Sequence, residues 1–186
     1  TLFRSMSMIG NDLLNEIIDI RGFTRPDLIL RALHSGVTNV LKQNESYNRD
    51  GMDLGLCMID SQNRKVEFAG AKNPLVYIRD GKAIRVKGSS MPIGGWDAES
   101  AENQHIFKTQ TISLIDEPTP FYLFSDGYAD QFGGKKNKKY MTKNLKKFLA
   151  KNHNDTMENQ GDRLEAEMEN WINGIEQTDD MLVIGF

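Results

Sequence analysis

The sequence predicts an α+β fold in which helices pack against layers of mostly antiparallel strands. Apolar residues recur with helical spacing at the start of the chain, change to the alternating period of strands in the middle, and return to helical spacing near the end. Helices and strands that occur in separate runs are typical of layered α+β domains. No repeat, linker or low-complexity stretch interrupts the 186 residues, so we expect one domain over residues 1–186.

Two helices are expected first. Between Met6 and Ile20 the apolar residues follow i, i+3, i+4 spacing, and Gly22 ends this helix. A second helix begins near Pro26, because proline suits the first position of a helix, and its apolar side continues to Leu41.

Short strands are expected in the middle of the chain. Their ranges are Met52–Ile59, Lys65–Ala71, Leu75–Arg79, Ala83–Lys87, His105–Ile115 and Phe121–Ser125. Asp80-Gly81 is a strong signal for a two-residue hairpin turn, and residues 88–95 are expected to form a loop.

The last third of the chain is expected to be mostly helical. The predicted helices are Gly127–Phe132, Thr142–Ala150 and Met157–Ile175, and a closing strand follows at Met181–Phe186. Thr156 suits the N-cap of the longest helix, and Gly174 lies near its end.

The composition is typical of a globular protein, with 39% hydrophobic and 26% charged residues. A net charge of −3 argues against nucleic-acid binding by the chain as a whole. No stretch reaches the roughly 18 apolar residues of a membrane helix. A single cysteine fits a reducing, cytoplasmic setting, for this chain alone or as the cytoplasmic part of a larger, membrane-anchored protein. The single cysteine, Cys57, lies in an apolar run and is interpreted as a packing residue.

Eight lysines lie within the 17 residues from Lys135 to Lys151. The ordinary interpretation is a solvated helix face that follows a lysine-rich loop. The alternative is a docking patch for an acidic partner or a phosphate-bearing surface. Its candidate partner-binding residues are Lys135, Lys136, Lys138 and Lys139.

One candidate site residue follows the apolar strand that ends at Ser125. There Asp126 is followed directly by Gly127. A carboxylate at a strand end is rigidly held and faces solvent, and a glycine beside it lets backbone or a ligand approach closely. The alternative is a simple turn in which Asp126 caps the helix that follows.

Asp179 and Asp180 form a second candidate, directly before the closing strand. Two neighbouring carboxylates repel each other unless a cation, protons or water relieve the repulsion. A solvated turn is again the alternative. If the two strands are neighbours in the sheet, these aspartates and Asp126 converge at one edge. Such hard oxygen ligands suit Mg²⁺ or Mn²⁺ better than Zn²⁺.

Other chemistries fit the sequence less well. His34, His105 and His153 have no metal-ligand spacing and are interpreted as ordinary residues. The chain contains no lysine-bearing phosphate loop, nucleophile elbow or dinucleotide fingerprint. Cys57 lacks a phosphate-cradling loop, which excludes a phosphatase with a cysteine nucleophile.

Residues 124–131 resemble the Ser-Asp-Gly motif of bacterial phosphatases of the stage II sporulation protein E type, within the metal-dependent type 2C superfamily. Residues 178–181 resemble the closing Asp-Asp or Asp-Asn motif of that family. Residues 51–56, 70–75 and 91–94 also match in place and order. The resemblance covers nearly all of the chain from about Met6 onward.

The resemblance implies a fold and an activity. The family fold is a layered α-β-β-α sandwich, and its members hydrolyse phosphoserine or phosphothreonine with a metal-activated water. Carried over, Asp126 and Asp179 are ligands of a dinuclear Mn²⁺ or Mg²⁺ centre, with Asp180 as a further candidate and Gly127 beside the cofactor. The implied partner is a phosphorylated regulatory protein, such as an anti-sigma-factor antagonist, and a homodimer is a further expectation.

One departure from the family pattern concerns the start of the chain. The family has an Asp-x-x-Gly-His-Gly segment, whose aspartate bridges the metals, just before a helix that resembles residues 6–11. Thr1–Ser5 contain no such segment, and Asp12 lies within the helix pattern. We therefore expect a domain truncated at its N-terminus, without the family's first strands, that binds metal weakly and has impaired activity.

Two rival functions follow from the same residues. A non-catalytic relative would bind a partner through the lysine-rich segment or an exposed sheet edge. A hydrolase for small phosphate esters would use the same aspartates.

Overall fold

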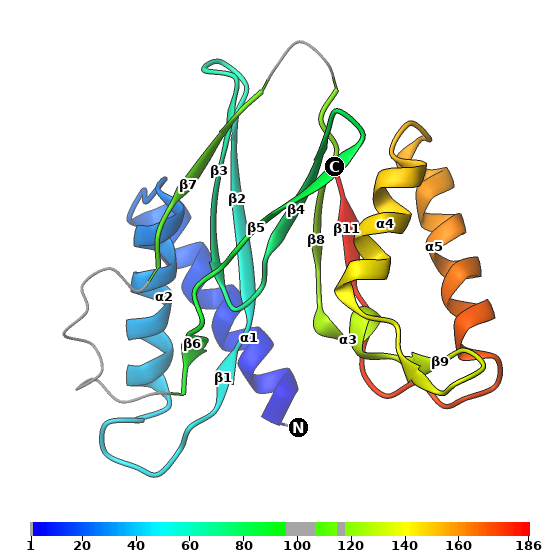
Figure 1. Ribbon diagram of the computed structural model, residues 1–186. Coiled ribbons are helices and arrows are strands. Elements are labelled where there is room, and N and C mark those ends of the chain that lie inside the picture. Colours follow the sequence, from blue (N-terminus) through cyan, green and yellow to red (C-terminus); the bar gives the residue numbers. More distant parts are fainter. Residues whose placement is uncertain (1, 96–106, 115–117) are drawn as a thin grey trace. The chain divides into compact units, whose positions relative to one another are not determined.

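The computed structural model describes residues 2–95, 107–114 and 118–186 (Figure 1). The chain divides into two compact units, one formed by Thr1–Asn73 and Lys87–Ile115 and the other by Pro74–Val86 and Asp116–Phe186. Each unit combines helices with an antiparallel sheet, which confirms the α+β class. Each unit has one main sheet and one two-stranded sheet. A single domain over residues 1–186 stays a prediction.

The first unit contains α1 (Leu2–Asn15), the π-helical turn η1 (Glu16–Ile20), α2 (Pro26–Val40), β1 (Gly51–Met52), β2 (Leu54–Asp60), β3 (Lys65–Ala71), β6 (Ile93–Gly94) and β7 (Gln110–Ser113). Its main sheet has the antiparallel order β2-β3-β7, and β1 pairs with β6. Helix α2 packs against β2 and β3, and α1 packs against α2. The fully buried side of α2 is formed by Ile29, Leu30, Leu33 and Val37.

The helix predicted to begin at Pro26 is confirmed, with the proline at the first helical position. The prediction for the first helix was wrong at its start. The helix begins at Leu2 instead of Met6, because no strong helix breaker precedes Met6, and it ends in the π-helical turn.

The prediction of a loop over residues 88–95 was wrong in part, because β6 forms there. The backbone N–H of Gly94 donates to His34 Nδ1 at 2.9 Å, and that of Gly95 donates to Gln43 Oε1 at 3.0 Å. Both glycines have positive φ values, +73° and +77°, which glycine adopts readily. The strand therefore depends on side chains far away in the sequence, which a local pattern does not reveal.

The second unit contains β4 (Leu75–Arg79), β5 (Lys82–Val86), β8 (Phe121–Phe124), α3 (Asp126–Asp130), β9 (Phe132–Gly133), β10 (Lys138–Lys139), α4 (Thr142–Asn152), α5 (Met157–Ile172) and β11 (Val183–Gly185). Its main sheet has the antiparallel order β11-β8-β4-β5. Asp80 and Gly81, with φ values of +53° and +67°, form the predicted two-residue turn between β4 and β5. The short β9-β10 hairpin was not predicted.

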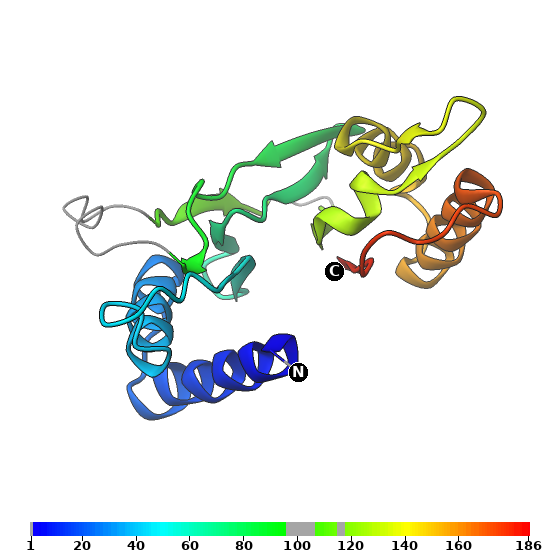
Figure 2. The same ribbon diagram turned by 90° about the horizontal axis from the view of Figure 1, so that it is seen from below.

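Helices α4 and α5 lie side by side (Figure 2) and share one apolar core with the sheet. The core residues from these helices and from β4 and β8 are Val76, Ile78, Tyr122, Phe124, Leu145, Leu149, Leu164 and Met168. Thr156 is the predicted N-cap of α5, and its side chain accepts a hydrogen bond from the backbone N–H of Asn159 at 3.3 Å. The helix ends at Ile172, before the predicted Ile175, because Asn173 adopts a left-handed conformation.

Cys57 is partly buried in β2. Burial raises the pKa of the Cys57 thiol to about 12, so the thiol stays protonated near neutral pH, as suits a packing residue. Of the strand expected at His105–Ile115, only β7, Gln110–Ser113, is observed, and residues 107–109 and 114 are not in a strand; His105 and Ile115 lie outside the described residues. Within the described ranges, no helix combines the length and the apolar character needed to cross a membrane.

Candidate metal centre

Two aspartate-bearing segments lie at the same end of the paired strands β8 and β11 in the β11-β8-β4-β5 sheet (Figure 1). Strand β11 pairs antiparallel with β8, and Val183 lies opposite Phe124. Because the strands are antiparallel, the C-terminal end of β8 lies beside the N-terminal end of β11. Asp126 follows β8, and Asp179 and Asp180 precede β11. The condition that the two strands are neighbours is therefore met.

Ser125 ties the two segments together just before Asp126. Its backbone N–H donates to the carbonyl oxygen of Leu182 at 3.0 Å. Its Oγ donates to the carbonyl oxygen of Asp180 and accepts from the backbone N–H of Leu182, both at 3.0 Å. The side chain thus continues the ladder between β8 and β11 beyond the last paired residues. Sequence reasoning gave Ser125 no role, although a hydroxyl at a strand end was the available signal.

Gly127 allows the two segments to approach each other closely. A Cβ atom added to this buried residue would overlap the carbonyl oxygen of Asp180 and would lie 3.0 Å from the carbonyl carbon. The group that approaches Gly127 is therefore the backbone of Asp180. Contact between Gly127 and a bound ligand stays a prediction.

The three candidate carboxylates are on exposed residues. The N-cap of α3 is Ser125, so Asp126 lies in the first turn and does not act as the cap. Asp179 Oδ1 accepts a hydrogen bond from the backbone N–H of Asp180 at 2.7 Å, which orients the Asp179 carboxylate. Carboxylate oxygens therefore face solvent from two segments that are held side by side.

These residues match Mg²⁺ or Mn²⁺ in ligand type, because both ions prefer carboxylate and water oxygens. They do not make a complete site. Among the described residues, no group of three or more His, Cys, Asp or Glu side chains is placed to hold a metal ion. The donor set is therefore suited to a hard cation but incomplete within the described part of the chain.

The two histidines in the described ranges make structural contacts. His34 accepts the hydrogen bond from Gly94, and desolvation by burial lowers its pKa below the ordinary value. His153 Nδ1 lies 2.7 Å from the carbonyl oxygen of Ala150 at the end of α4. Both contacts agree with their interpretation as ordinary residues.

The candidate partner-binding lysines are all exposed, but they differ in their contacts. Lys139 forms an ion pair with Asp130 at 2.7 Å and lies over the ring of Phe132. It belongs with Lys138 to β10, which pairs with β9. Lys139 therefore has a local structural role in addition to any role in binding.

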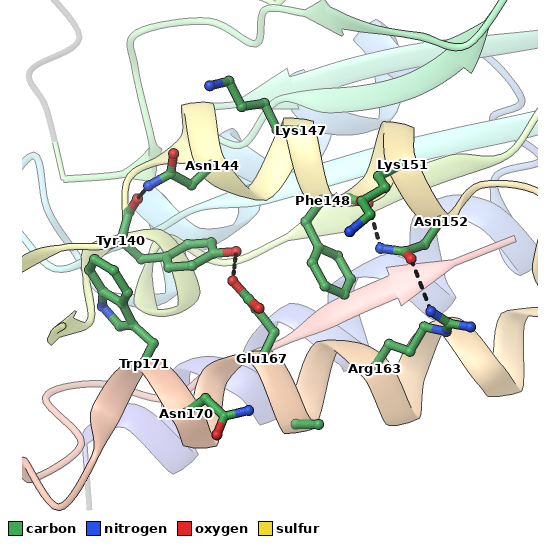
Figure 3. A pocket seen from close by; sticks show the side chains of 11 residues that line it. Tyr140, Asn144, Lys147, Phe148, Lys151, Asn152, Arg163, Glu167, Asn170 and Trp171 are labelled. Atoms are coloured by element: carbon green, nitrogen blue, oxygen red, sulfur yellow. Dashed lines mark hydrogen bonds between the residues drawn. The ribbon is translucent and has the colours of Figure 1, made fainter.

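A groove of about 500 Å³ lies between α4 and α5 (Figure 3). Lys147, Lys151 and Arg163 contribute positive charge to its lining, Glu167 contributes negative charge, and Phe148 and Trp171 contribute aromatic surface. None of the three candidate aspartates lines it. The groove extends the lysine-rich surface along α4, and its lining carries more positive than negative side chains.

Comparison with known families decides the classification of the chain. The family model described as "Stage II sporulation protein E (SpoIIE)" matches residues 1–186. The chain belongs to the stage II sporulation protein E family. No curated protein matches this SpoIIE-family chain.

Solved structures share the fold of this SpoIIE-family chain. The SiaA-PP2C domain of Pseudomonas aeruginosa is 24% identical, with a TM-score of 0.84 over 97% of this chain and 68% of that chain. The manganese-presoaked phosphatase domain of SpoIIE from Bacillus subtilis is 17% identical, with a TM-score of 0.58 over 95% of this chain and 72% of that chain. The RsbU and RsbW domains of a Mycobacterium tuberculosis protein are 16% identical, with a TM-score of 0.65 over 97% and 46% of the respective chains. The chain thus has the fold of PP2C-type phosphatase domains.

Proposed function

We propose that this chain forms the metal-binding part of a protein serine/threonine phosphatase, in which Asp126 and Asp179 bind Mn²⁺ or Mg²⁺ and Asp180 is a further candidate ligand. The observation that carries the proposal is the pairing of β8 with β11, which sets the two aspartate-bearing segments side by side. Membership of the SpoIIE family supports the same reaction class.

The role of the chain's own residues is to present the carboxylates. Ser125 fixes the backbone beside Asp126 to that of Asp180, and Gly127 lets the two backbones lie in contact. A hard cation at this edge would relieve the repulsion between adjacent carboxylates. When bound, such metal ions activate water as a nucleophile and offset the charge on phosphoryl oxygens.

The proposed substrate is phosphoserine or phosphothreonine on a regulatory protein, such as an anti-sigma-factor antagonist. Similarity to a protein with RsbU and RsbW domains supports this class of partner. We propose that the partner docks through acidic residues on the exposed lysines, of which Lys135, Lys136 and Lys138 are the strongest candidates. A cytoplasmic location and a homodimer belong to the same proposal.

The incomplete donor set leads to an expectation for the 186-residue chain itself. With Asp126, Asp179 and Asp180 as the proposed ligands, water would fill most of the positions around the ion, so we expect this chain to bind Mn²⁺ weakly and to turn over slowly. The test is hydrolysis of a phosphoserine peptide with Mn²⁺, comparing this chain with a version that carries an Asp-x-x-Gly-His-Gly segment before the first helix.

The extended version should be active. Asp126→Asn or Asp179→Asn should each reduce its rate of hydrolysis by more than about 100-fold, because loss of a residue that only orients a metal ligand already costs roughly 10–100-fold. Asp162→Asn, an exposed change on α5, is the control and should have no effect. Undiminished hydrolysis by the two aspartate variants would contradict the proposal. Turnover of small phosphate esters alone would favour a metabolite hydrolase.

A second candidate function is favoured by the lysine-rich surface and the groove between α4 and α5. A non-catalytic, phosphatase-like module would use this surface to bind an acidic partner without hydrolysis. The same assay separates the two functions. A module would bind the partner while the extended version stayed inactive at every Mn²⁺ concentration.

A further inference from the structure

Gln131 directly follows α3, and its side chain is completely buried, with an exposure of 0%. Burial of an amide is unfavourable unless its hydrogen-bonding groups find partners. The contacts of Gln131 are therefore informative, because they show which part of the fold this buried amide holds in place.

The side chain of Gln131 uses both of its polar atoms to hold the segment that leads to Asp179. Nε2 donates to the carbonyl oxygens of Phe132 at 3.0 Å and Glu176 at 3.1 Å. Oε1 accepts from the backbone N–H of Thr178 at 3.0 Å and from its hydroxyl at 3.3 Å. A glutamine amide has two donor hydrogens and two acceptor lone pairs, so all four are used.

The backbone of Gln131 is itself held from three directions. Its N–H donates to the carbonyl oxygen of Gly127 at 3.1 Å. Its carbonyl oxygen accepts from the backbone N–H of Tyr140 at 2.9 Å and from Trp171 Nε1 at 3.1 Å. The rings of Tyr140 and Trp171 pack edge to face at 5.2 Å (Figure 3). The amide therefore projects from a rigid position.

The segment that Gln131 holds has local support as well, because Gln177 Nε2 donates to the carbonyl oxygen of Asp179 at 2.7 Å and Met181 packs against the apolar core. Residues 175–182 lie between α5 and β11 and form no helix or strand. Gln131 anchors this segment at Thr178, and Ser125 anchors it at Asp180. Asp179 lies between these two anchored residues. Asp126 itself lies in the chain between Ser125 and Gln131, the two residues that make these hydrogen bonds.

We propose that Gln131 is a positioning residue of the metal centre, which holds Asp179 in register with Asp126 through Thr178. This inference rests on the proposed function for the identity of the metal ligands. The hydrogen bonds of Gln131 set the backbone at the Asp179 side of the site, as those of Ser125 do at the Asp180 side. Without Gln131, the segment would lose its hydrogen bonds at Glu176 and Thr178 and would keep those between Ser125 and residues 180 and 182.

Gln160 provides a matched control. It is a buried glutamine in the same unit, with an exposure of 2%. Its Oε1 accepts from Tyr122 Oη at 2.6 Å, and its Nε2 donates to the carbonyl oxygen of Asp155 at 2.8 Å. Neither bond reaches residues 175–182, the segment that contains Asp179. Gln131→Met and Gln160→Met remove the same chemical groups, but only the first removes an anchor of Asp179.

The first test is backbone amide exchange, measured by NMR without metal in the 186-residue chain. Gln131→Met should speed exchange at Thr178 by about tenfold or more, as loss of its hydrogen-bond acceptor requires. Gln160→Met should leave that rate unchanged. Equal exchange at Thr178 in the wild-type chain and Gln131→Met, or equal acceleration in both variants, would overturn the proposal.

The second test is the Mn²⁺ concentration that half-saturates broadening of the amide signals near Asp126. It should rise in Gln131→Met by about 10–100-fold, the usual effect of losing a residue that orients a ligand. It should not change in Gln160→Met. If the wild-type chain binds no Mn²⁺ here, the proposed function fails, while the exchange experiment still decides whether Gln131 holds Thr178.

A wild-type measurement covers the case in which Gln131→Met does not fold. The side-chain amide hydrogens of Gln131 should exchange slowly, because both are donated within the protein. Exchange as fast as that of an exposed glutamine, such as Gln62, would overturn the proposal without any variant.

Discussion

At the scale of single residues, the candidate centre depends on a close approach between Gly127 and the carbonyl group of Asp180. Gly127→Ala would place a methyl group against this carbonyl, and backbone on both sides would have to shift. We expect the free energy of unfolding to fall by about 1–3 kcal/mol, the usual cost of an overpacked buried position. Urea denaturation of the variant measures this change.

Gly161→Ala is the control for this substitution. Gly161 lies within α5, is exposed, and has no heavy atom within 4 Å of the added methyl group. Because alanine favours a helix more than glycine does, this variant should be more stable by about 0.5–1 kcal/mol. Destabilisation of equal size in both variants would show that the contact with Asp180 is not the cause.

A second residue-scale prediction concerns pH. Burial lowers the pKa of His34, so the unfolded chain binds a proton more readily than the folded chain does. Stability should therefore be highest above the ordinary histidine pKa of about 6.5 and should fall as the pH decreases below it, by at most about 1.4 kcal/mol per pH unit for one proton.

His34→Gln tests this pH dependence. A glutamine side chain can still accept a hydrogen bond from Gly94 but cannot take up a proton. Urea denaturation between pH 7.5 and 5.5 should give a shallower loss of stability for the variant than for the wild-type chain. Parallel curves for the two proteins would mean that His34 does not contribute.

Some residues of the candidate site could be predicted from the sequence, and others could not. Asp126 and Asp179 were predicted because carboxylates beside apolar strands are visible in the sequence. Gln131 was not predicted to have a role, because an ordinary polar residue after a short helix gives no sign that the fold will bury it. Its importance depends on bonds to Thr178 and Glu176, which are distant in sequence.

At the scale of secondary-structure elements, the boundaries with local causes were predicted best. The bounds of β3 and β4 agree with the sequence prediction, because alternating residues and turns mark their ends. The two-residue strands β6, β9 and β10 were missed. A strand of two residues has no periodicity, and its existence depends on a partner elsewhere in the chain.

The N-terminus of α5 gives an element-scale prediction. Thr156→Ala removes the side-chain acceptor for the N–H of Asn159 and should lower the free energy of unfolding by about 1 kcal/mol. Thr142→Ala is the control, because the N-cap of α4 is Met141 and makes no side-chain bond. The control should change stability by about 0.5 kcal/mol or less in thermal or urea denaturation. Equal losses would contradict a capping role for Thr156.

At the scale of the whole molecule, the sequence predicted the α+β class and the order of its main elements. It predicted the meeting of Asp126 and Asp179 only on the condition that their strands are neighbours, because strand order is a tertiary property. The pairing of β8 with β11 meets this condition. The family match over residues 1–186 and the PP2C-type fold support the phosphatase class, while the position of the centre beside these strands stays a proposal.

The central claim is that Asp126 and Asp179 bind one metal centre together, and paramagnetic broadening by Mn²⁺ tests it most directly. In an NMR titration of the 186-residue chain, the amide signals of residues 126–127 and 179–181 should broaden first. Asp126→Asn or Asp179→Asn should each abolish this early broadening at both segments. Broadening that begins at other acidic positions, such as the exposed carboxylates of α5, and leaves these two segments unaffected would contradict the claim.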